Sequence, residues 1–229
     1  MIDFAVFDID GTTVSDKDYV ARAFQKAFYY SQLEVSATDI NPLMGYPKPI
    51  AIQIVLERKG VEFDRELVDK IHKEFENDMM DFYEFSPYVK AMPDSEDIFF
   101  FLKEKGVKIA LNTGFSKNIA EIIVRRFQWV ERRLIDDFIC SDQVSRGRPF
   151  PYMIDALKKR NNINDDAIVM KVGDTIADIL EGRNAGCKYV VAVTTGSARR
   201  EDLEEHSPTH IISSLSEIPG ILSQSAQYV

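Results

Sequence analysis

Cysteine, histidine and tryptophan are scarce in this chain of 229 residues, which contains two Cys, three His and one Trp. Cys140 and Cys187 stand far apart and form no metal-ligand spacing, so we expect reduced thiols in a cytoplasmic protein. Long apolar runs are also missing, and none approaches the roughly 18 residues of a membrane span. The first residues lack the pattern of a signal peptide. These absences predict a protein without a membrane partner.

Basic residues are outnumbered. The chain has 28 Lys and Arg against 37 Asp and Glu, a formal net charge of −9. This balance argues against nucleic acid or an anionic membrane as the main partner. An acidic protein that binds a phosphate must gather positive charge locally, so a cationic site is expected. The length allows one large domain, or a core with a small accessory domain.

Short apolar runs alternate with helix-like segments along most of the chain. The strand-like runs are residues 4–9, 107–111, 138–140, 167–172, 189–193 and 210–212. The helical segments between and after them are residues 94–104, 116–127, 149–160, 177–185 and 214–223. This alternation predicts the α/β class, with a Rossmann-like parallel sheet flanked by helices. Ligands of such sheets bind beyond the carboxyl ends of the strands.

One interval interrupts the alternation. Residues 15–87 contain no convincing strand, and apolar stripes at helical spacing occur in 20–28, 50–56 and 67–82. We therefore predict an all-helical domain of residues 15–87 inserted over the strand ends. The catalytic core would then comprise residues 1–14 and 88–229.

The first predicted strand ends in Asp8-Ile9-Asp10-Gly11. Two carboxylates separated by one residue can act as a nucleophile and a general acid, and Gly11 permits a sharp reversal of the chain. The alternative interpretation is an ordinary turn rich in Asp.

Two further segments suit a phosphate. Thr113 and Gly114 follow the second strand, where a hydroxyl and backbone N–H groups can face an anion. Arg148 precedes a proline at the start of a predicted helix and can bind phosphate oxygens with two N–H groups. A loop position in solvent is the alternative for Arg148, and Arg146 is its rival.

Asp174 and Asp178 lie four residues apart at a junction between strand and helix. One carboxylate from the loop and one from the first helical turn can face the same site. Hard oxygen ligands suit Mg²⁺, which retains waters and accepts a substrate phosphate. A helix cap with an acid that stabilises the helix dipole is the alternative.

Taken together, the segments DIDGTT, NTG, GRP and GDTIAD resemble the four motifs of the haloacid dehalogenase superfamily, over the whole chain. The resemblance implies that Asp8 is the nucleophile, which forms an aspartyl-phosphate, and that Asp10 is the acid and base. It implies that Thr113, Gly114 and Arg148 hold the phosphoryl group. Mg²⁺ would bind Asp8, the Asp10 carbonyl and Asp174, with Asp178 close by.

Most superfamily members have Lys where this chain has Arg148. The segments GRPFPYM and MGYPK (residues 44–48) resemble the phosphonoacetaldehyde hydrolase branch, in which a lysine matching Lys48 forms a Schiff base. This chain departs from that branch at Asp10, where the branch has Ala, and at Ala51, where it has His.

An acid at position 10 suits ester hydrolysis, so we predict a Mg²⁺-dependent phosphatase of a small phosphorylated metabolite. Carbon–phosphorus cleavage through Lys48 and a phosphomutase activity are the alternatives. Lys48 could also contact substrate without catalysing, or lie at the surface. The oligomeric state, monomer or homodimer, is left open.

Overall fold

The computed structural model describes residues 2–15 and 17–224. Six strands form one sheet in the order β5-β4-β1-β6-β7-β8, and every neighbouring pair is parallel. The strands are β1 (Phe4–Asp8), β4 (Lys108–Thr113), β5 (Asp137–Cys140), β6 (Val169–Gly173), β7 (Tyr189–Val193) and β8 (His210–Ile212). The predicted α/β class with a parallel sheet is confirmed.

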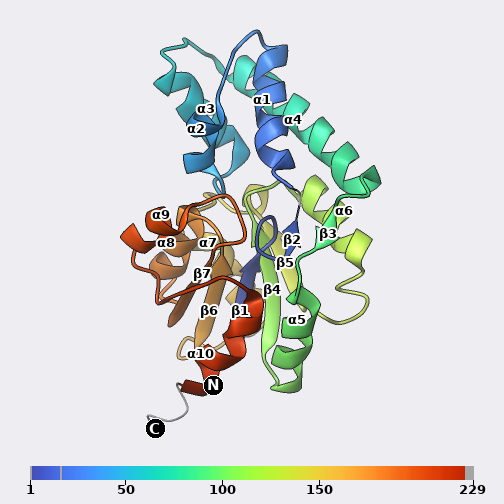
Figure 1. Cartoon of the computed structure of the whole chain (residues 1–229), viewed down its shortest axis with the longest axis vertical. Coiled ribbons are helices and arrows are strands. Elements are labelled where there is room, and N and C mark those ends of the chain that lie inside the picture. Colours follow the sequence, from blue (N-terminus) through green and yellow to red (C-terminus); the bar gives the residue numbers. More distant parts are fainter. Residues whose placement is uncertain (1, 16, 225–229) are drawn as a thin grey trace.

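The helices that follow these strands in the chain pack against the sheet (Figure 1). They are α5 (Ser95–Glu104), α6 (Lys117–Phe127), α7 (Tyr152–Arg160), α8 (Ile176–Asn184), α9 (Arg200–Glu205) and α10 (Ile218–Gln224), with short 3-10 turns η2 (Ser141–Gln143) and η3 (Leu215–Glu217). The five residues of β1 are all buried, because a central parallel strand is covered on both faces.

The remaining helices gather above the upper edge of the sheet in Figure 1. These helices are α1 (Tyr19–Tyr30), α2 (Ala37–Ile40), α3 (Lys48–Arg58) and α4 (Arg65–Phe85), with the 3-10 turn η1 (Asn41–Leu43). Helix α4 begins at a capping residue, Asp64, whose side chain accepts a hydrogen bond from the backbone N–H of Leu67. The segment is helical, as its apolar spacing predicted.

A short antiparallel pair joins the helical segment to the sheet domain. Strand β2 (Val14–Ser15) pairs with β3 (Lys90–Ala91), so the two connections run side by side. Ser15, which we expected in the helical insertion, thus lies in a strand. Met1 and Asp16, which fall within the predicted ranges, lie outside the described residues. The boundaries 15–87 remain a prediction.

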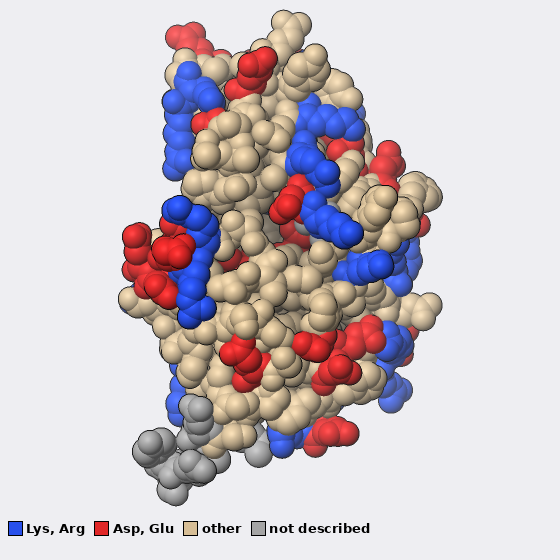
Figure 2. Space-filling view, in the orientation of Figure 1, with Lys and Arg blue, Asp and Glu red and all other residues tan. Residues whose placement is uncertain are grey.

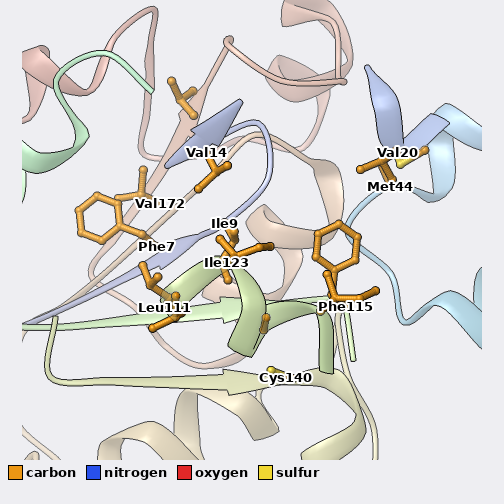
Figure 3. Close-up of a cluster of buried hydrophobic side chains, with 14 of the residues drawn as sticks. Phe7, Ile9, Val14, Val20, Met44, Leu111, Phe115, Ile123, Cys140 and Val172 are labelled. Atoms are coloured by element: carbon orange, nitrogen blue, oxygen red, sulfur yellow. The ribbon is translucent and has the colours of Figure 1, made fainter. Parts of the chain in front are cut away.

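Apolar side chains from both parts form a continuous cluster. In the close-up of Figure 3, Phe115 lies on the side of the cluster that faces Val20 and Met44, while Phe7 and Leu111 lie over the sheet. Fully burying one such side chain contributes about 1.5–3 kcal/mol. This packing holds α1–α4 over the strand ends.

In the second apolar stripe, residues 50–56, only the first residue fails to pack inward as expected. Ile50 is 44% exposed, while Ala51, Ile52, Val55 and Leu56 of α3 are buried. Because α3 carries apolar residues on more than one side, its sequence does not indicate which side packs inward.

The two cysteines are free, and burial raises the pKa of each thiol to about 12. Such thiols stay protonated and unreactive at neutral pH. Trp129, at 0% exposure, is a packing residue.

Candidate active site

The central strands β1 and β6 end side by side where the strand order reverses. The chain moves from β1 to β4 and β5 on one side, and then returns to β6 on the other side of β1. Asp8 is the last residue of β1, and Asp174 directly follows β6. Parallel sheets bind ligands in the crevice at such a switch point, and here the crevice lies beneath α1–α4.

Three carboxylates meet in this crevice. Asp8, Asp174 and Asp178 each offer an oxygen within 4.8 Å of the others, and all three side chains are buried. Burial and the neighbouring Asp178 raise the pKa of Asp8 to about 6, against the opposing effect of Arg148. Burial, Asp8 and Asp178 raise the pKa of Asp174 to about 8. Carboxylates crowded in this way repel one another until a cation joins them.

Arg148 supplies part of that positive charge. Its Nη1 lies 2.7 Å from Asp8 Oδ1 and 3.0 Å from Asp178 Oδ1. Burial lowers the pKa of Arg148, but Asp178, Asp8 and Glu181 outweigh it and raise the pKa above its usual value. Its rival Arg146 is exposed and stacks on Phe150, with 3.4 Å from its guanidinium carbon to the ring centroid. The loop therefore brings Arg148 into the crevice and leaves Arg146 outside it.

Behind Arg148 lies a buried polar network that the sequence analysis missed. Glu181 accepts from Arg148 Nε at 3.0 Å, and both of its oxygens accept from the Asn112 amide. Lys171, in the middle of β6, donates to Asn112 Oδ1 at 2.7 Å and lies 2.8 Å from Asp178 Oδ1. Arg148 Nη2 donates to both the carbonyl and the side-chain oxygen of Asn112. The guanidinium is thus fixed on three sides.

Asp178 caps a helix and also faces the site, the two roles that its position at the junction allowed. It forms a capping box with Thr175 at the start of α8, accepting on Oδ2 from the Thr175 backbone N–H. Its other oxygen faces Lys171 and Arg148. Although burial opposes it, Arg148 and Lys171 lower the pKa of Asp178 below its usual value. Since the cations of Lys171 and Arg148 already balance the charge of this carboxylate, Asp178 is better suited to orient the site than to bind a metal directly.

Asp174 is oriented on the other side of the crevice. Its Oδ1 accepts from the Thr12 hydroxyl and its Oδ2 from the Ser197 backbone N–H, both at 3.0 Å. Gly196 approaches so closely that a Cβ at that position would lie 1.8 Å from Asp174 Oδ2. The close approach of the backbone holds the carboxylate beside Asp8.

Asp10 lies apart from the three clustered carboxylates. It is half-buried, and its Oδ1 accepts a hydrogen bond of 3.1 Å from the hydroxyl of Tyr83 in α4. Gly11, at φ +81°, turns the chain after it. Asp8 and Asp10 therefore have different partners, Arg148 and Tyr83, which suits two different roles.

A pocket of about 620 Å³ connects these groups. It is lined by Asp8, Asp10, Thr113, Gly114, Arg148 and Asp174 from the sheet domain, and by Arg22, Gln25, Asn41, Met44 and Lys48 from the helical segment. Figure 2 shows the molecule hollowed between its upper and lower parts, with acidic side chains inside and Lys and Arg along one rim. The predicted phosphate-binding residues thus share one pocket with Asp8, Asp10 and Asp174.

Lys48 reaches this pocket from the start of α3. It is 4% exposed, and its Nζ lies 5.7, 5.8 and 5.3 Å from the ring centroids of Phe24, Phe75 and Phe115. Aromatic faces stabilise a cation at such distances. The surface alternative for Lys48 is wrong, and the choice between a substrate-binding and a catalytic role stays open.

A family model described as "Haloacid dehalogenase-like hydrolase" matches residues 5–192. The chain belongs to this family. As a haloacid dehalogenase-like hydrolase, the protein is an enzyme. Among the described residues, no helix is long and apolar enough to cross a membrane.

Several relatives of this hydrolase are similar over nearly its whole length. A phosphonoacetaldehyde hydrolase from Bacillus mycoides (strain KBAB4) is 27% identical over 226 residues, which cover 92% of this chain and 84% of that protein. A hydrolase from Pseudomonas syringae superposes with a TM-score of 0.85 at 18% identity, covering 98% and 99% of the two chains. A phosphonoacetaldehyde hydrolase-like protein from Oleispira antarctica gives 0.83 at 20% identity, covering 97% and 92%. These two structures support the fold, and the resemblance to the phosphonoacetaldehyde hydrolase branch is confirmed.

Proposed function

We propose that this hydrolase is a Mg²⁺-dependent phosphatase, which cleaves a small phosphate monoester through an aspartyl-phosphate on Asp8. The observation that carries the proposal is the placement of two carboxyl groups in one pocket. Asp8 lies against Arg148 at the strand end, while Asp10 lies apart and is held by Tyr83. One carboxylate can attack phosphorus while the other serves the leaving oxygen.

The reaction would proceed in two steps. First, an Asp8 oxygen forms a bond to phosphorus as the ester oxygen leaves, taking a proton from Asp10. Then Asp10 accepts a proton from water, the water oxygen attacks phosphorus, and the acyl-phosphate bond to Asp8 breaks. Arg148, Thr113 and the backbone of Gly114 line the pocket beside Asp8, where they could bind the phosphoryl oxygens.

The charges of the site fit a divalent cation. Around the crevice, the buried side chains from the sheet domain include four carboxylates, Asp8, Asp174, Asp178 and Glu181, and two cations, Arg148 and Lys171. Two negative charges are therefore left over when all are ionised. Asp8 and Asp174, with the Asp10 carbonyl, would hold Mg²⁺, and Asp178 would orient the neighbouring cations. The ion would neutralise charge on the phosphoryl group.

The helical segment would act as a cap over this chemistry. We propose residues 15–87 as the cap and residues 1–14 and 88–229 as the core. Cap and core meet closely at the loop that precedes α3, where a Cβ on Gly45 would lie 2.4 Å from the Thr175 hydroxyl. A closed cap would exclude water from the phosphoryl group and select the leaving group.

Gly45→Ala tests this closure. Gly45 has φ +83°, so alanine there is strained as well as too close to Thr175. We expect kcat/KM for phosphate esters to fall at least about tenfold, because the added methyl group would keep the loop before α3 from its close contact with Thr175. Gly60→Ala is the matched control, since Gly60 has φ +67° but no atom within 4 Å of an added Cβ. Equal activity of the two variants would contradict a tight closure at Gly45.

Carbon–phosphorus cleavage is the second candidate, and the burial of Lys48 favours it. A buried lysine that loses its proton can condense with an aldehyde, releasing water, and the resulting imine can accept the electrons of a breaking carbon–phosphorus bond. The relative from Bacillus mycoides is named for the hydrolysis of phosphonoacetaldehyde. The presence of Asp10 and Ala51 favours ester hydrolysis instead, since an oxygen leaving group needs an acid.

Variants at Asp10 and Lys48 separate the two candidates. We expect Asp10→Ala to lower kcat for phosphate esters by roughly 10²- to 10⁴-fold, the usual contribution of a general acid. Lys48→Ala should chiefly raise KM, because the cation would bind substrate without taking part in bond cleavage. Steady-state kinetics in Mg²⁺ with a panel of small phosphate esters and phosphonoacetaldehyde would measure both effects.

A trapping experiment completes this comparison. Borohydride reduces an imine to a stable amine, and mass spectrometry of the digested protein would locate it. We expect no adduct on Lys48 when phosphonoacetaldehyde is supplied, and Lys48→Arg serves as the control that keeps charge but forms no imine. An adduct on Lys48, together with phosphate release, would establish the second candidate.

A further inference from the structure

A hydrogen bond joins the pocket's second carboxyl group to the helical segment. The hydroxyl of Tyr83, near the end of α4, donates to Asp10 Oδ1 at 3.1 Å, although the two residues are 73 positions apart. Tyr83 is fully buried. A tyrosine that served only as a packing residue would not require this hydrogen bond. The contact therefore suggests that the Tyr83 hydroxyl has a role at the Asp10 carboxyl group.

Tyr83 is held firmly on every side. Its ring packs edge-on against Phe115, with centroids 5.8 Å apart, and against Phe82 at 5.5 Å. Its backbone oxygen accepts from Arg126 Nη1 at 2.7 Å, and Arg126 Nη2 donates to the carbonyl of Ser86 at 2.6 Å. Because Arg126 belongs to α6, this clamp ties the end of α4 to the sheet domain. These contacts therefore hold the Tyr83 hydroxyl in one place relative to the sheet domain.

Asp10, in contrast, lies at the start of a turn, where its backbone forms an isolated β-bridge with Val14. It follows β1 by two residues, precedes Gly11 at φ +81°, and is half-buried. The orientation of such a carboxyl group about its two side-chain bonds depends on the groups that contact it. A general acid must lie within about 2.6–3.2 Å of the oxygen that it protonates, so free rotation would reduce the fraction of enzyme ready to react.

We propose that Tyr83 is a positioning residue that holds the Asp10 carboxyl group toward the leaving oxygen of the substrate. The proposal rests on the phosphatase function proposed above, in which Asp10 is the acid. Tyr83 acts through Asp10 and through no contact of its own with the phosphoryl group. The pocket is lined by Asp10 and not by Tyr83.

The leaving group provides the test. An ethoxide leaving group depends strongly on an acid, whereas p-nitrophenolate leaves with little help. Since kcat/KM covers the steps up to departure of the leaving group, we expect Tyr83→Phe to lower it about tenfold for ethyl phosphate. For p-nitrophenyl phosphate the loss should stay below about threefold. A purely structural defect would lower both values equally, and that result would overturn the proposal.

Two further variants provide the controls. Tyr19→Phe also removes a hydroxyl that donates to a carboxylate at 3.1 Å, in this case Asp78 of α4, so it should leave the ratio of the two rates unchanged. Asp10→Ala removes the group that Tyr83 holds, so adding Tyr83→Phe to it should have no further effect on ethyl phosphate. A further tenfold loss in that background, or a faster Tyr83→Phe enzyme, would refute the positioning role.

A structural measurement separates this proposal from the function on which it rests. If the wild-type enzyme cleaves no phosphate ester with Mg²⁺, the proposed function fails. Crystal structures of the wild type and of Tyr83→Phe still decide the role of Tyr83. We expect the Asp10 side chain to leave its wild-type orientation in Tyr83→Phe. An unchanged, fully ordered Asp10 in that variant would show that Tyr83 does not position it.

Discussion

Asp8→Asn is expected to lower the turnover of phosphate esters at least about 10³-fold, because an amide oxygen is a poor nucleophile toward phosphorus. Asp8 ends the central strand β1 and lies 2.7 Å from Arg148. The amide keeps the size of the side chain but loses the charge that faces Arg148. Steady-state kinetics with the best ester of the panel would measure the loss.

A second measurement on this variant examines the covalent step. Acid quenching during turnover, followed by digestion and mass spectrometry, should show a phosphorylated peptide containing Asp8 in the wild type and none in Asp8→Asn. Circular dichroism and thermal unfolding would verify that the variant is folded. A folded Asp8→Asn enzyme with wild-type turnover would rule out Asp8 as the nucleophile.

Removal of the divalent cation is expected to have the second largest effect. Chelation should abolish activity, and added Mg²⁺ should restore it, because Asp8 and Asp174 would otherwise repel an anionic substrate. Asp174→Ala should raise the Mg²⁺ concentration needed for half-maximal rate at least about tenfold, since one of the two carboxylate ligands is lost. Rates measured across a Mg²⁺ titration give this value.

A carboxylate outside the pocket provides the control for the metal titration. Asp155 of α7 is exposed, so Asp155→Ala should have the same Mg²⁺ dependence as the wild type. Isothermal titration of Mg²⁺ into the folded proteins would provide a reading without substrate. Full activity in excess chelator, or an unchanged Mg²⁺ requirement in Asp174→Ala, would contradict the proposed metal site.

Much of the fold follows from short-range patterns in the sequence. The six runs of apolar residues became the six strands because a parallel sheet with both faces covered needs continuous apolar runs. The acidic residues Asp8, Asp10 and Asp174 of the pocket lie at or just after the ends of these strands. Because parallel strands end at the same edge of a sheet, the sheet alone predicts that these residues lie close together. Asp8 and Asp174 illustrate this, since each ends or follows a strand beside the switch point.

The network behind Arg148 was harder to foresee. Lys171 carried a usable signal, because a lysine inside the apolar run 167–172 must find a buried partner of opposite charge. Glu181 carried none, since an acid in a helix of mixed composition is usually exposed. Tyr83 sits just beyond the apolar stripe 67–82, and nothing in its sequence neighbourhood indicates that its hydroxyl meets Asp10. Such pairings depend on how distant elements pack.

The contact between Gly114 and the loop before α3 bears on how the enzyme could acquire new substrates. A Cβ on Gly114 would lie 2.6 Å from the carbonyl oxygen of Gly45 and 2.7 Å from that of Tyr46. The two parts of the molecule therefore meet here through backbone atoms, without a side chain between them. Pocket residues such as Gln25 and Asn41 lie outside this contact. They can be exchanged to fit another leaving group while the fit at Gly114 is kept, which makes them the first positions to vary in a directed-evolution library.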